Sequence, residues 1–146
     1  MRVAIGSDHA GFEQKERLRA HLTAAGREVV DEGTYDGDSV DYPDFARKVG
    51  RAVASGEADF GVLVCGTGIG MAIAANKVPG VRAANVTDPE FARLARQHNN
   101  ANVIAVSGRF VPEDVNAGII DAFLDTAFEG GRHAGRVSKI EAAEQE

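Results

Sequence analysis

The chain has no tryptophan and few other aromatic residues, 6% in all, among its 146 residues. Its core must therefore consist mainly of aliphatic side chains, and 44% hydrophobic residues suit an α/β core of Ala, Val, Ile and Leu. Basic residues are also in deficit, since 16 Lys and Arg against 22 Asp and Glu give a net charge of −6. This charge argues against binding to nucleic acid or to an anionic membrane, both of which require a basic surface, but it is compatible with a small anionic ligand.

Two further absences concern the cell compartment. The single cysteine, Cys65, cannot form a disulfide within the chain, which fits a reducing cytoplasm. No apolar run approaches the ~20 residues needed to cross a bilayer. The N-terminal segment turns polar after Ile5, unlike a signal peptide. We therefore expect a cytoplasmic protein with one domain, residues 1–146, in which residues from about 133 to 146 form a helical tail.

Short apolar runs alternate with amphipathic stretches along the chain, without a repeat or a linker. Such alternation predicts an α/β fold in which a five-stranded parallel sheet carries helices on both faces. The predicted strands are residues 2–5, 27–33, 60–65, 81–86 and 102–108. The predicted helices are residues 11–26, 44–56, 68–77, 88–99 and 111–128.

Ligands of parallel sheets bind at the carboxyl ends of the strands, near a topological switch point. This rule directs attention to the segments that follow the predicted strands. They are residues 6–12, 32–42, 65–70, 85–89 and 107–111.

The segment Cys-Gly-Thr-Gly-Ile-Gly, residues 65–70, follows the third predicted strand and begins a helix. A dinucleotide fingerprint, G-x-G-x-x-G, would need its last glycine at Met71 or Ile73, so neither register closes. Asp88 does lie at about the distance of 20 residues that the fingerprint requires. A P-loop is excluded because no Gly-Lys-Ser or Gly-Lys-Thr follows. Dinucleotide binding is therefore the weakest of the alternatives.

The same segment has the properties of an anion site beside a thiol. Gly66, Gly68 and Gly70 allow backbone N–H groups to converge at the start of a helix, and this environment favours the thiolate form of Cys65. Thr67 adds a hydroxyl. A thiolate base beside oxyanion-stabilising groups suits proton abstraction next to a carbonyl, where an enediolate forms. The alternative interpretation is a buried, inert cysteine ahead of a structural turn.

Basic residues near the C-terminus could bind a phosphate group. Arg132 and Arg136 are four residues apart with His133 between them, and if the segment is helical both guanidinium groups share one face. Paired guanidinium groups match phosphate bidentately, so this pair predicts a phosphate clamp. The alternative is a solvated helix whose arginines pair with nearby glutamates. Arg109 follows the fifth predicted strand and adds a third cation at a ligand-facing end.

Other polar residues lie where ligands of such a sheet bind. Asp8 and His9 directly follow the first predicted strand. His98 and Asn99 end the helix before the fifth strand, where Asn99 or Asn100 could instead serve as the helix C-cap.

A zinc site is disfavoured by spacing. Cys65, His9, His98 and His133 offer no local Cys/His pair, so a site would have to be assembled wholly from distant residues. The fourth histidine, His21, lies within a predicted helix and is expected to be an ordinary surface residue.

Five segments together occur in the order seen in one enzyme family. They are GSDHAGF, DYPD, CGTGIGMAIAANK, ARQHNNANVIAVSGR and EGGRHAGRV. From Arg2 to about Ile140 the chain resembles the type B ribose-5-phosphate isomerases, a family that also includes galactose-6-phosphate isomerase subunits. This resemblance implies a Rossmann-like three-layer domain, active as a homodimer or a dimer of dimers, with neither a metal nor a nucleotide cofactor.

The family interconverts aldose and ketose phosphates through a cis-enediol at a site shared between two subunits. By resemblance, Cys65 is the base that moves the proton between C1 and C2, Thr67 assists at the substrate hydroxyls, and the amides of residues 66–70 hold the enediolate oxygen. Asp8 and His98 would open the furanose ring, with His98 supplied by the partner subunit.

The resemblance also implies the residues that bind the substrate. Asn99 would contact the sugar oxygens, and Tyr42 would line the pocket. Cysteine at position 65 and isoleucine at position 69 fit the branch of the family that uses a thiol rather than a glutamate. The residues implied for the phosphate are His9, Arg109, Arg132 and Arg136.

The implied reaction is the interconversion of D-ribose 5-phosphate and D-ribulose 5-phosphate in the non-oxidative pentose phosphate pathway. One alternative is the same chemistry on a hexose 6-phosphate, such as allose or galactose 6-phosphate, which would share the phosphate-binding and ring-opening groups. Another is a non-catalytic sensor of a sugar phosphate or nucleotide, because a fold alone does not fix function. The presence of Cys65, Thr67 and His98 favours an enzyme, since a sensor needs no base.

Overall fold

The apolar runs of the sequence form the strands of one sheet. In the computed structural model, which describes residues 1–146, all neighbouring strands pair in parallel, in the order β2-β1-β3-β5-β4. The strands are β1 Arg2–Ser7, β2 Glu28–Asp31, β3 Phe60–Cys65, β4 Ala83–Asn85 and β5 Val103–Ser107. The predicted α/β class with a five-stranded parallel sheet is confirmed.

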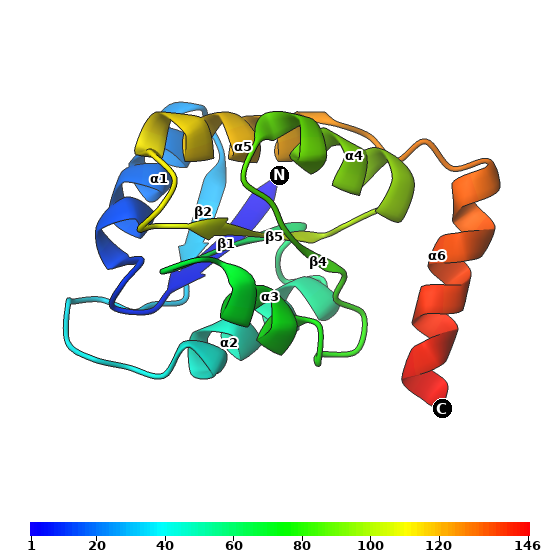
Figure 1. Ribbon diagram of the computed structural model, residues 1–146, viewed down its shortest axis with the longest axis horizontal. Helices are drawn as coiled ribbons and strands as arrows, with labels where there is room; N and C mark the ends of the chain where they lie inside the picture. The colour runs from blue at the N-terminus through cyan, green and yellow to red at the C-terminus, as the bar shows by residue number, and fades with distance from the viewer.

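Helices cover both faces of this sheet. They are α1 Phe12–Ala24, α2 Tyr42–Ala54, α3 Ile69–Ala75, α4 Pro89–Asn99, α5 Glu113–Asp125 and α6 Arg132–Ala142, with a final 3-10 turn at Ala143–Gln145. Figure 1 shows α1, α4 and α5 on one face, α2 and α3 on the other, and α6 standing away from the three layers. None of the helices combines the length and the hydrophobicity that a membrane span requires.

The core lies on both sides of the sheet because successive side chains of a strand point to opposite faces. Val62 and Val64 of β3 pack in a cluster with Leu18 and Phe123, under α1, α4 and α5. Leu63 of the same strand belongs to a second cluster, under α2 and α3. The unbroken apolar run of β3 therefore reflects a central strand that is covered on both faces.

Several element boundaries differ from those predicted. β1 continues to Ser7, because it pairs with β3 as far as Val64. β4 is shorter than predicted, three residues in place of six, and lies at the edge of the sheet with one neighbour. α2 begins at Tyr42 rather than residue 44, since Pro43 is accepted in a first helical turn, where its missing N–H has no intrahelical partner anyway.

Helix α4 begins and ends as its sequence indicates. The Asp88 side chain accepts the N–H of Phe91 at 3.0 Å, and Pro89 is the first helical residue, which confirms the predicted N-cap. At the other end Asn100 adopts a left-handed conformation with φ of 47° and serves as the C-cap.

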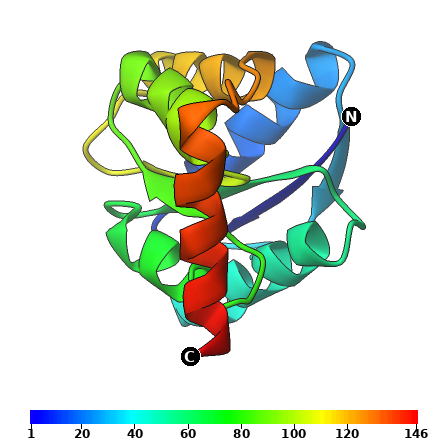
Figure 2. The ribbon, with the colours of Figure 1, turned by 90° about the vertical axis from the view of Figure 1, so that its right-hand side faces the viewer.

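Helix α6 lies beside the β4 edge of the sheet. Figure 2 shows that it runs from the level of α4 and α5 past the sheet to the level of α2 and α3. Its side chains are mostly exposed, and only His133 and Val137 are buried. Two contacts near its end tie it to the body of the molecule: Arg82 pairs with Glu141 at 3.2 Å, and the N–H of Gly80 donates to Glu144 at 2.9 Å.

Candidate active site

A tight turn after β3 holds the only thiol of the chain. Cys65 is the last residue of the strand and is 6% exposed. Its Sγ accepts the backbone N–H of Gly68 at 3.1 Å. This contact places a hydrogen-bond donor at the sulfur, on the side of the turn that follows β3. The N–H groups of Gly66, Thr67 and Gly70 donate to no acceptor within the chain.

Close approach of neighbouring elements explains two of the glycines. Gly68 has a φ of +85°, and a Cβ there would lie 2.4 Å from Nδ2 of Asn85. A Cβ on Gly70 would lie 2.6 Å from the ring of Tyr42. The first residue of α2 is therefore packed against the turn that follows β3. Any side chain larger than hydrogen would force these elements apart.

Thr67 and Arg109 lie at the same turn. Thr67 is exposed, and its Oγ1 accepts the N–H of Ile69 at 3.1 Å, which leaves its hydroxyl proton free to donate. The backbone N–H of Arg109 donates to the carbonyl of Gly66 at 3.1 Å. A Cβ on Gly66 would lie 3.4 Å from both Cδ and Nη1 of Arg109, so this guanidinium lies beside the turn.

The neighbouring strand β1 brings Asp8 and His9 to the same edge of the sheet. Asp8 is 7% exposed, and its Oδ1 accepts the N–H of Gly11 at 3.0 Å. His9 accepts the backbone N–H of Val40 on its Nδ1 at 3.1 Å. In the neutral imidazole, Nε2 then carries the proton and can donate to a ligand. A hollow of about 640 Å³ opens beside His9.

His98 and Asn99 lie elsewhere, at the end of α4. In the β3–β5 pairing, Cys65 is level with Ser107, while Val103 begins β5 four residues earlier. That separation corresponds to about 13 Å along the strand. Because His98 precedes Val103, it lies toward the opposite edge of the sheet from Cys65. No hydrogen bond or ion pair joins His98 or Asn99 to the turn after β3.

His98 is part of a small cluster with the start of α6. Its ring stacks on that of His133, with centroids 4.3 Å apart and planes at 14°. Its Nε2 lies 3.7 Å from Oε1 of Glu129. Burial, followed by the nearby His98 and Arg132, lowers the pKa of His133 below its ordinary value. The cluster therefore favours a neutral His133 at pH 7.

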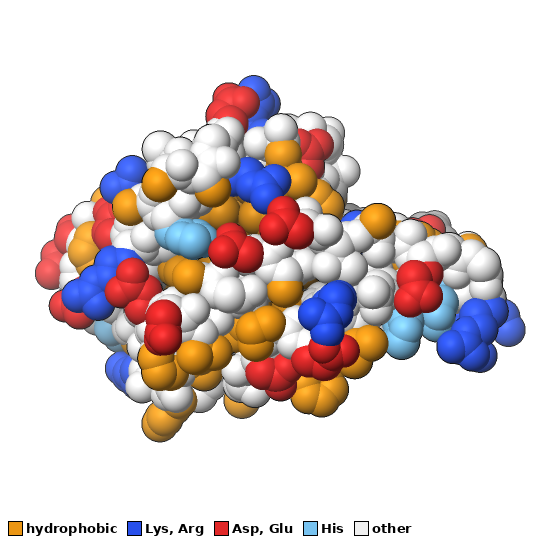
Figure 3. All heavy atoms as spheres, turned by 90° about the horizontal axis from the view of Figure 1, so that it is seen from above, with side chains coloured by type: hydrophobic (Ala, Val, Ile, Leu, Met, Phe, Trp, Pro, Cys, Tyr) orange, Lys and Arg blue, Asp and Glu red, His pale blue; other side chains and the backbone are white.

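Arg132 and Arg136 both lie on α6, one helical turn apart, so their side chains share a face as the spacing predicted. Both are exposed, and neither forms an ion pair with a carboxylate within 4.0 Å. The alternative of a solvated helix therefore agrees with the exposure of these two residues, but the pairing with glutamates that it supposes is absent. Figure 3 shows histidine and Lys/Arg side chains together on the projecting end of the molecule that α6 forms.

The histidine cluster contains enough ligand atoms for a metal site, but the two rings are not oriented to bind the same ion. One ligand atom each from His98, Glu129 and His133 lies within 4.8 Å of the others. Nearly parallel rings 4.3 Å apart direct their nitrogen lone pairs along parallel planes. Both nitrogens cannot then point at one zinc ion at the usual ~2.0–2.1 Å. Cys65 lies too far away to join such a site.

Two buried cations were not predicted from the sequence. Lys15 has no solvent exposure, and Arg96 is 7% exposed and donates to the carbonyls of Ala101 and Thr126. A signal for the first was present, because Lys15, Leu18 and Leu22 follow one another at helical spacing on the buried face of α1. A lysine on an apolar stripe indicates a buried acceptor.

Three comparisons with known proteins agree with one another. The family model described as Ribose/Galactose Isomerase matches residues 3–140. Ribose-5-phosphate isomerase B of Escherichia coli is 48% identical over 144 residues, covering 99% of this chain and 97% of that protein. The solved Clostridium thermocellum ribose-5-phosphate isomerase B has a TM-score of 0.98 and 50% identity, covering 99% and 98%. That of Mycoplasma genitalium, with bound ribulose-5-phosphate, has a TM-score of 0.96 and 47% identity, covering 99% and 97%.

Proposed function

The chain belongs to the Ribose/Galactose Isomerase family, and we propose that it interconverts D-ribose 5-phosphate and D-ribulose 5-phosphate through a cis-enediolate. The observation that carries this proposal is the contact between the Gly68 N–H and Sγ of Cys65 at the carboxyl edge of the sheet. A thiol held in a fixed position at this edge suits the base of an enzyme, and neither a sensor nor a dinucleotide-binding module needs one. The bound ribulose-5-phosphate of the Mycoplasma genitalium relative supports the pentose.

The proposed reaction moves one proton between two carbons. The Cys65 thiolate takes the proton from C2 of the open-chain aldose, the electron pair moves to form the C1–C2 double bond, and the thiol returns the proton to C1. A second proton passes between the oxygens on C1 and C2, where Thr67 assists. The three N–H groups of the turn that lack an acceptor in the chain, those of Gly66, Thr67 and Gly70, would stabilise the enediolate oxygen.

We further propose that two subunits build each site. Cys65, Thr67 and Asp8 come from one chain, while His98, Asn99, Arg132 and Arg136 come from its partner. Two observations support this arrangement. Within one chain, His98 and Asn99 lie far from Cys65. The guanidinium groups of Arg132 and Arg136 pair with no carboxylate of their own chain. Asp8 and His98 would then open the furanose ring from opposite sides.

The remaining substrate contacts follow from the same geometry. Tyr42 lies against Gly70 and would line the pocket. His9, as an Nε2–H donor, and Arg109, beside the turn, would bind the phosphate together with the two arginines of α6. A cytoplasmic location and a homodimer or dimer of dimers complete the proposal. Binding energy from the phosphate would align C1 and C2 with the thiolate.

A substrate panel in EDTA tests this proposal. Purified protein is mixed separately with ribose 5-phosphate, allose 6-phosphate and galactose 6-phosphate, and formation of each ketose phosphate is followed. We expect the highest kcat/KM with ribose 5-phosphate. A higher value with a hexose phosphate would reassign the substrate. Tight binding of all three without turnover would favour the sensor.

A further inference from the structure

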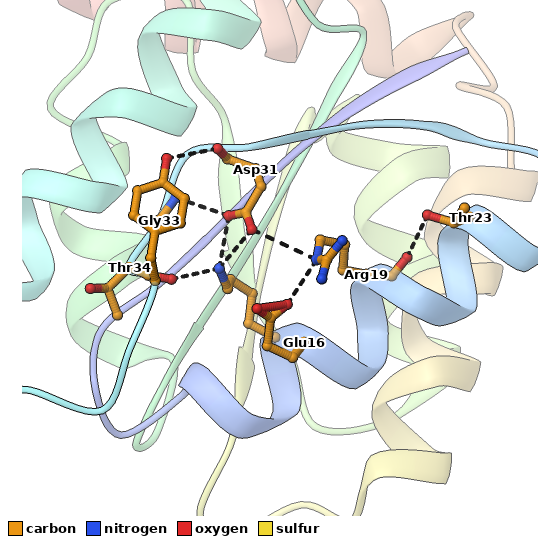
Figure 4. A network of polar contacts seen from close by, with 8 residues as sticks. Glu16, Arg19, Thr23, Asp31, Gly33 and Thr34 are labelled. Carbon is orange, nitrogen blue, oxygen red and sulfur yellow. Dashed lines mark hydrogen bonds and ion pairs between the residues drawn. The ribbon is translucent and has the colours of Figure 1, made fainter.

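Lys15 is a charged side chain inside the protein. It has no solvent exposure and lies on the buried face of α1. Its Nζ donates to Oδ1 and Oδ2 of Asp31 at 2.8 and 3.0 Å and to the carbonyl of Thr34 at 2.6 Å. Figure 4 shows Asp31, Gly33 and Thr34 gathered around this network. The rings of Phe12 and Tyr35 lie 5.5 and 5.4 Å from the ammonium.

Stability alone does not require a lysine at this position. Replacing a buried ion pair by apolar side chains of similar volume is often neutral or stabilising, because burial removes the hydration of the charges. Here Lys15 loses all of its exposure, while the Asp31 side chain stays 23% exposed. The neighbouring positions on the same stripe, Leu18 and Leu22, are apolar. The contacts of the ammonium instead hold a neighbouring segment in place.

The network fixes the chain where it leaves β2. Oδ1 of Asp31 also accepts the N–H of Gly33 at 3.0 Å. The carbonyl of Gly33 accepts the N–H of Ser7 at 2.7 Å, and the N–H of Thr34 donates to the carbonyl of Ser7 at 2.9 Å. Residues 31–34 are thus held between α1 and the end of β1.

That segment leads directly to two groups of the proposed site. The loop after Thr34 carries Val40, whose N–H donates to Nδ1 of His9 at 3.1 Å. Two residues later it enters α2 with Tyr42, which packs against Gly70. His9 itself follows Ser7 by two residues, so its position depends on the network from both sides.

We propose that Lys15 is a positioning residue, which acts through Asp31 and the Thr34 carbonyl to hold the 35–41 loop so that His9 presents its Nε2–H to the substrate phosphate. This proposal rests on the proposed function for the identity of the ligand. Cys65 lies on β3, outside the network, so Lys15 acts on substrate affinity and not on proton transfer.

The variant Lys15→Met tests the proposal with a side chain of similar length and no charge. Asp31 keeps a second cation, since Nε of Arg19 lies 3.7 Å from its Oδ2. We expect KM for ribose 5-phosphate to rise roughly tenfold while kcat stays within about twofold. In a His9→Ala background the same substitution should leave KM nearly unchanged, because the group it positions is gone. Lys48→Met, at an exposed lysine on α2, is the matched control and should match wild type.

Other results would overturn the proposal. An unchanged KM, or an equal rise in KM with and without His9, would reduce Lys15 to a structural role. Nitrogen NMR of His9 gives a readout that needs no turnover: wild type should show Nδ1 as the acceptor and Nε2 as protonated, and Lys15→Met should lose this preference. If Lys15→Met does not fold, Asp31→Asn weakens the same contact and should give the same changes. Absence of turnover in wild type with an intact His9 signature would instead count against the proposed function alone.

Discussion

The edge of the sheet around Cys65 and the surface around α6 differ in how their polar groups are held. At the Cys65 edge, Asp8 and His9 have their side chains bonded to backbone N–H groups, and the thiol accepts the N–H of Gly68. On α6, Arg132 and Arg136 are exposed and pair with no carboxylate. The first region is organised by its own chain before a ligand arrives. The second carries two positive charges that no carboxylate of the same chain pairs with.

This contrast matters because preorganised dipoles contribute most to stabilising a transition state, whereas guanidinium groups without a partner in the chain can bind a phosphate bidentately. In the proposed function, the Cys65 edge therefore carries out the chemical step, and the α6 surface binds the phosphate. Three experiments test these two roles and a fourth tests the contact between α6 and α4, in order from the largest expected effect to the smallest.

Removal of the thiol should distinguish the roles of the two regions most clearly. Cys65→Ala should lower kcat by at least about 10²–10⁴-fold, the range of a lost general base, while substrate binding is largely kept. Steady-state kinetics and calorimetric binding of ribose 5-phosphate measure the two quantities. Ser55→Ala, at the exposed end of α2, is the control. A kcat near that of wild type would reject the thiolate mechanism.

Mixed dimers test whether the two regions meet across subunits. Cys65→Ala and His98→Ala chains carrying different tags are co-expressed, and the heterodimer is purified through both tags. One of its two sites then has both groups intact, so about half of the wild-type activity should return while each variant homodimer stays inactive. A heterodimer as inactive as the homodimers would show that the site lies within one chain.

Loss of a single arginine of α6 should affect affinity rather than chemistry. Arg132→Ala or Arg136→Ala should weaken binding of phosphorylated sugars by roughly 1.5–3 kcal/mol, the contribution of a charge-assisted hydrogen bond. Inhibition constants for a sugar phosphate and for its unphosphorylated sugar are compared. Lys139→Ala, also exposed on α6, is the control. Equal losses for the two ligands would contradict a phosphate clamp.

The smallest effect concerns the stack that joins α6 to α4. Burial and the neighbouring His98 and Arg132 lower the pKa of His133 below its ordinary value of 6.5, so the folded state binds this proton less readily than the unfolded chain. Stability should therefore fall as the pH drops below 6.5. Thermal unfolding at pH 7 and pH 5 compares wild type with His133→Phe, which keeps an aromatic ring against His98 without a titrating group. The same pH dependence in both proteins would contradict this account.

The framework of the fold could be predicted because its signals are local. Short apolar runs indicated five strands, the unbroken run of β3 indicated a strand buried on both faces, and Asp88 with Pro89 indicated the start of α4. The ends of the elements were predicted less accurately, since pairing with a neighbouring strand extends β1 and an edge position shortens β4. Family membership was also predicted, from five motifs spread over nearly the whole chain, and the comparisons confirm it.

Contacts between distant segments could not be predicted from spacing. The sequence placed His98 at a helix end, but its distance from Cys65 follows from how α4 returns along the sheet. The contact between Tyr42 and Gly70 joins residues 28 positions apart. The burial of Lys15 could have been predicted, since a lysine interrupts the apolar stripe of α1. Its acceptors could not, because they lie on β2 and in the loop that follows it.

The burial of Lys15 also gives this protein a built-in chemical reporter. The chain has four lysines, Lys15, Lys48, Lys77 and Lys139, and three of them are exposed. An amine-reactive reagent will modify those three at once and Lys15 only in molecules whose β2–α2 segment has opened. The extent of acylation at Lys15, read by mass spectrometry, therefore counts the opened molecules directly. Added substrate should lower the rate of acylation at Lys15. The rate at the three exposed lysines should stay unchanged and serve as the internal reference.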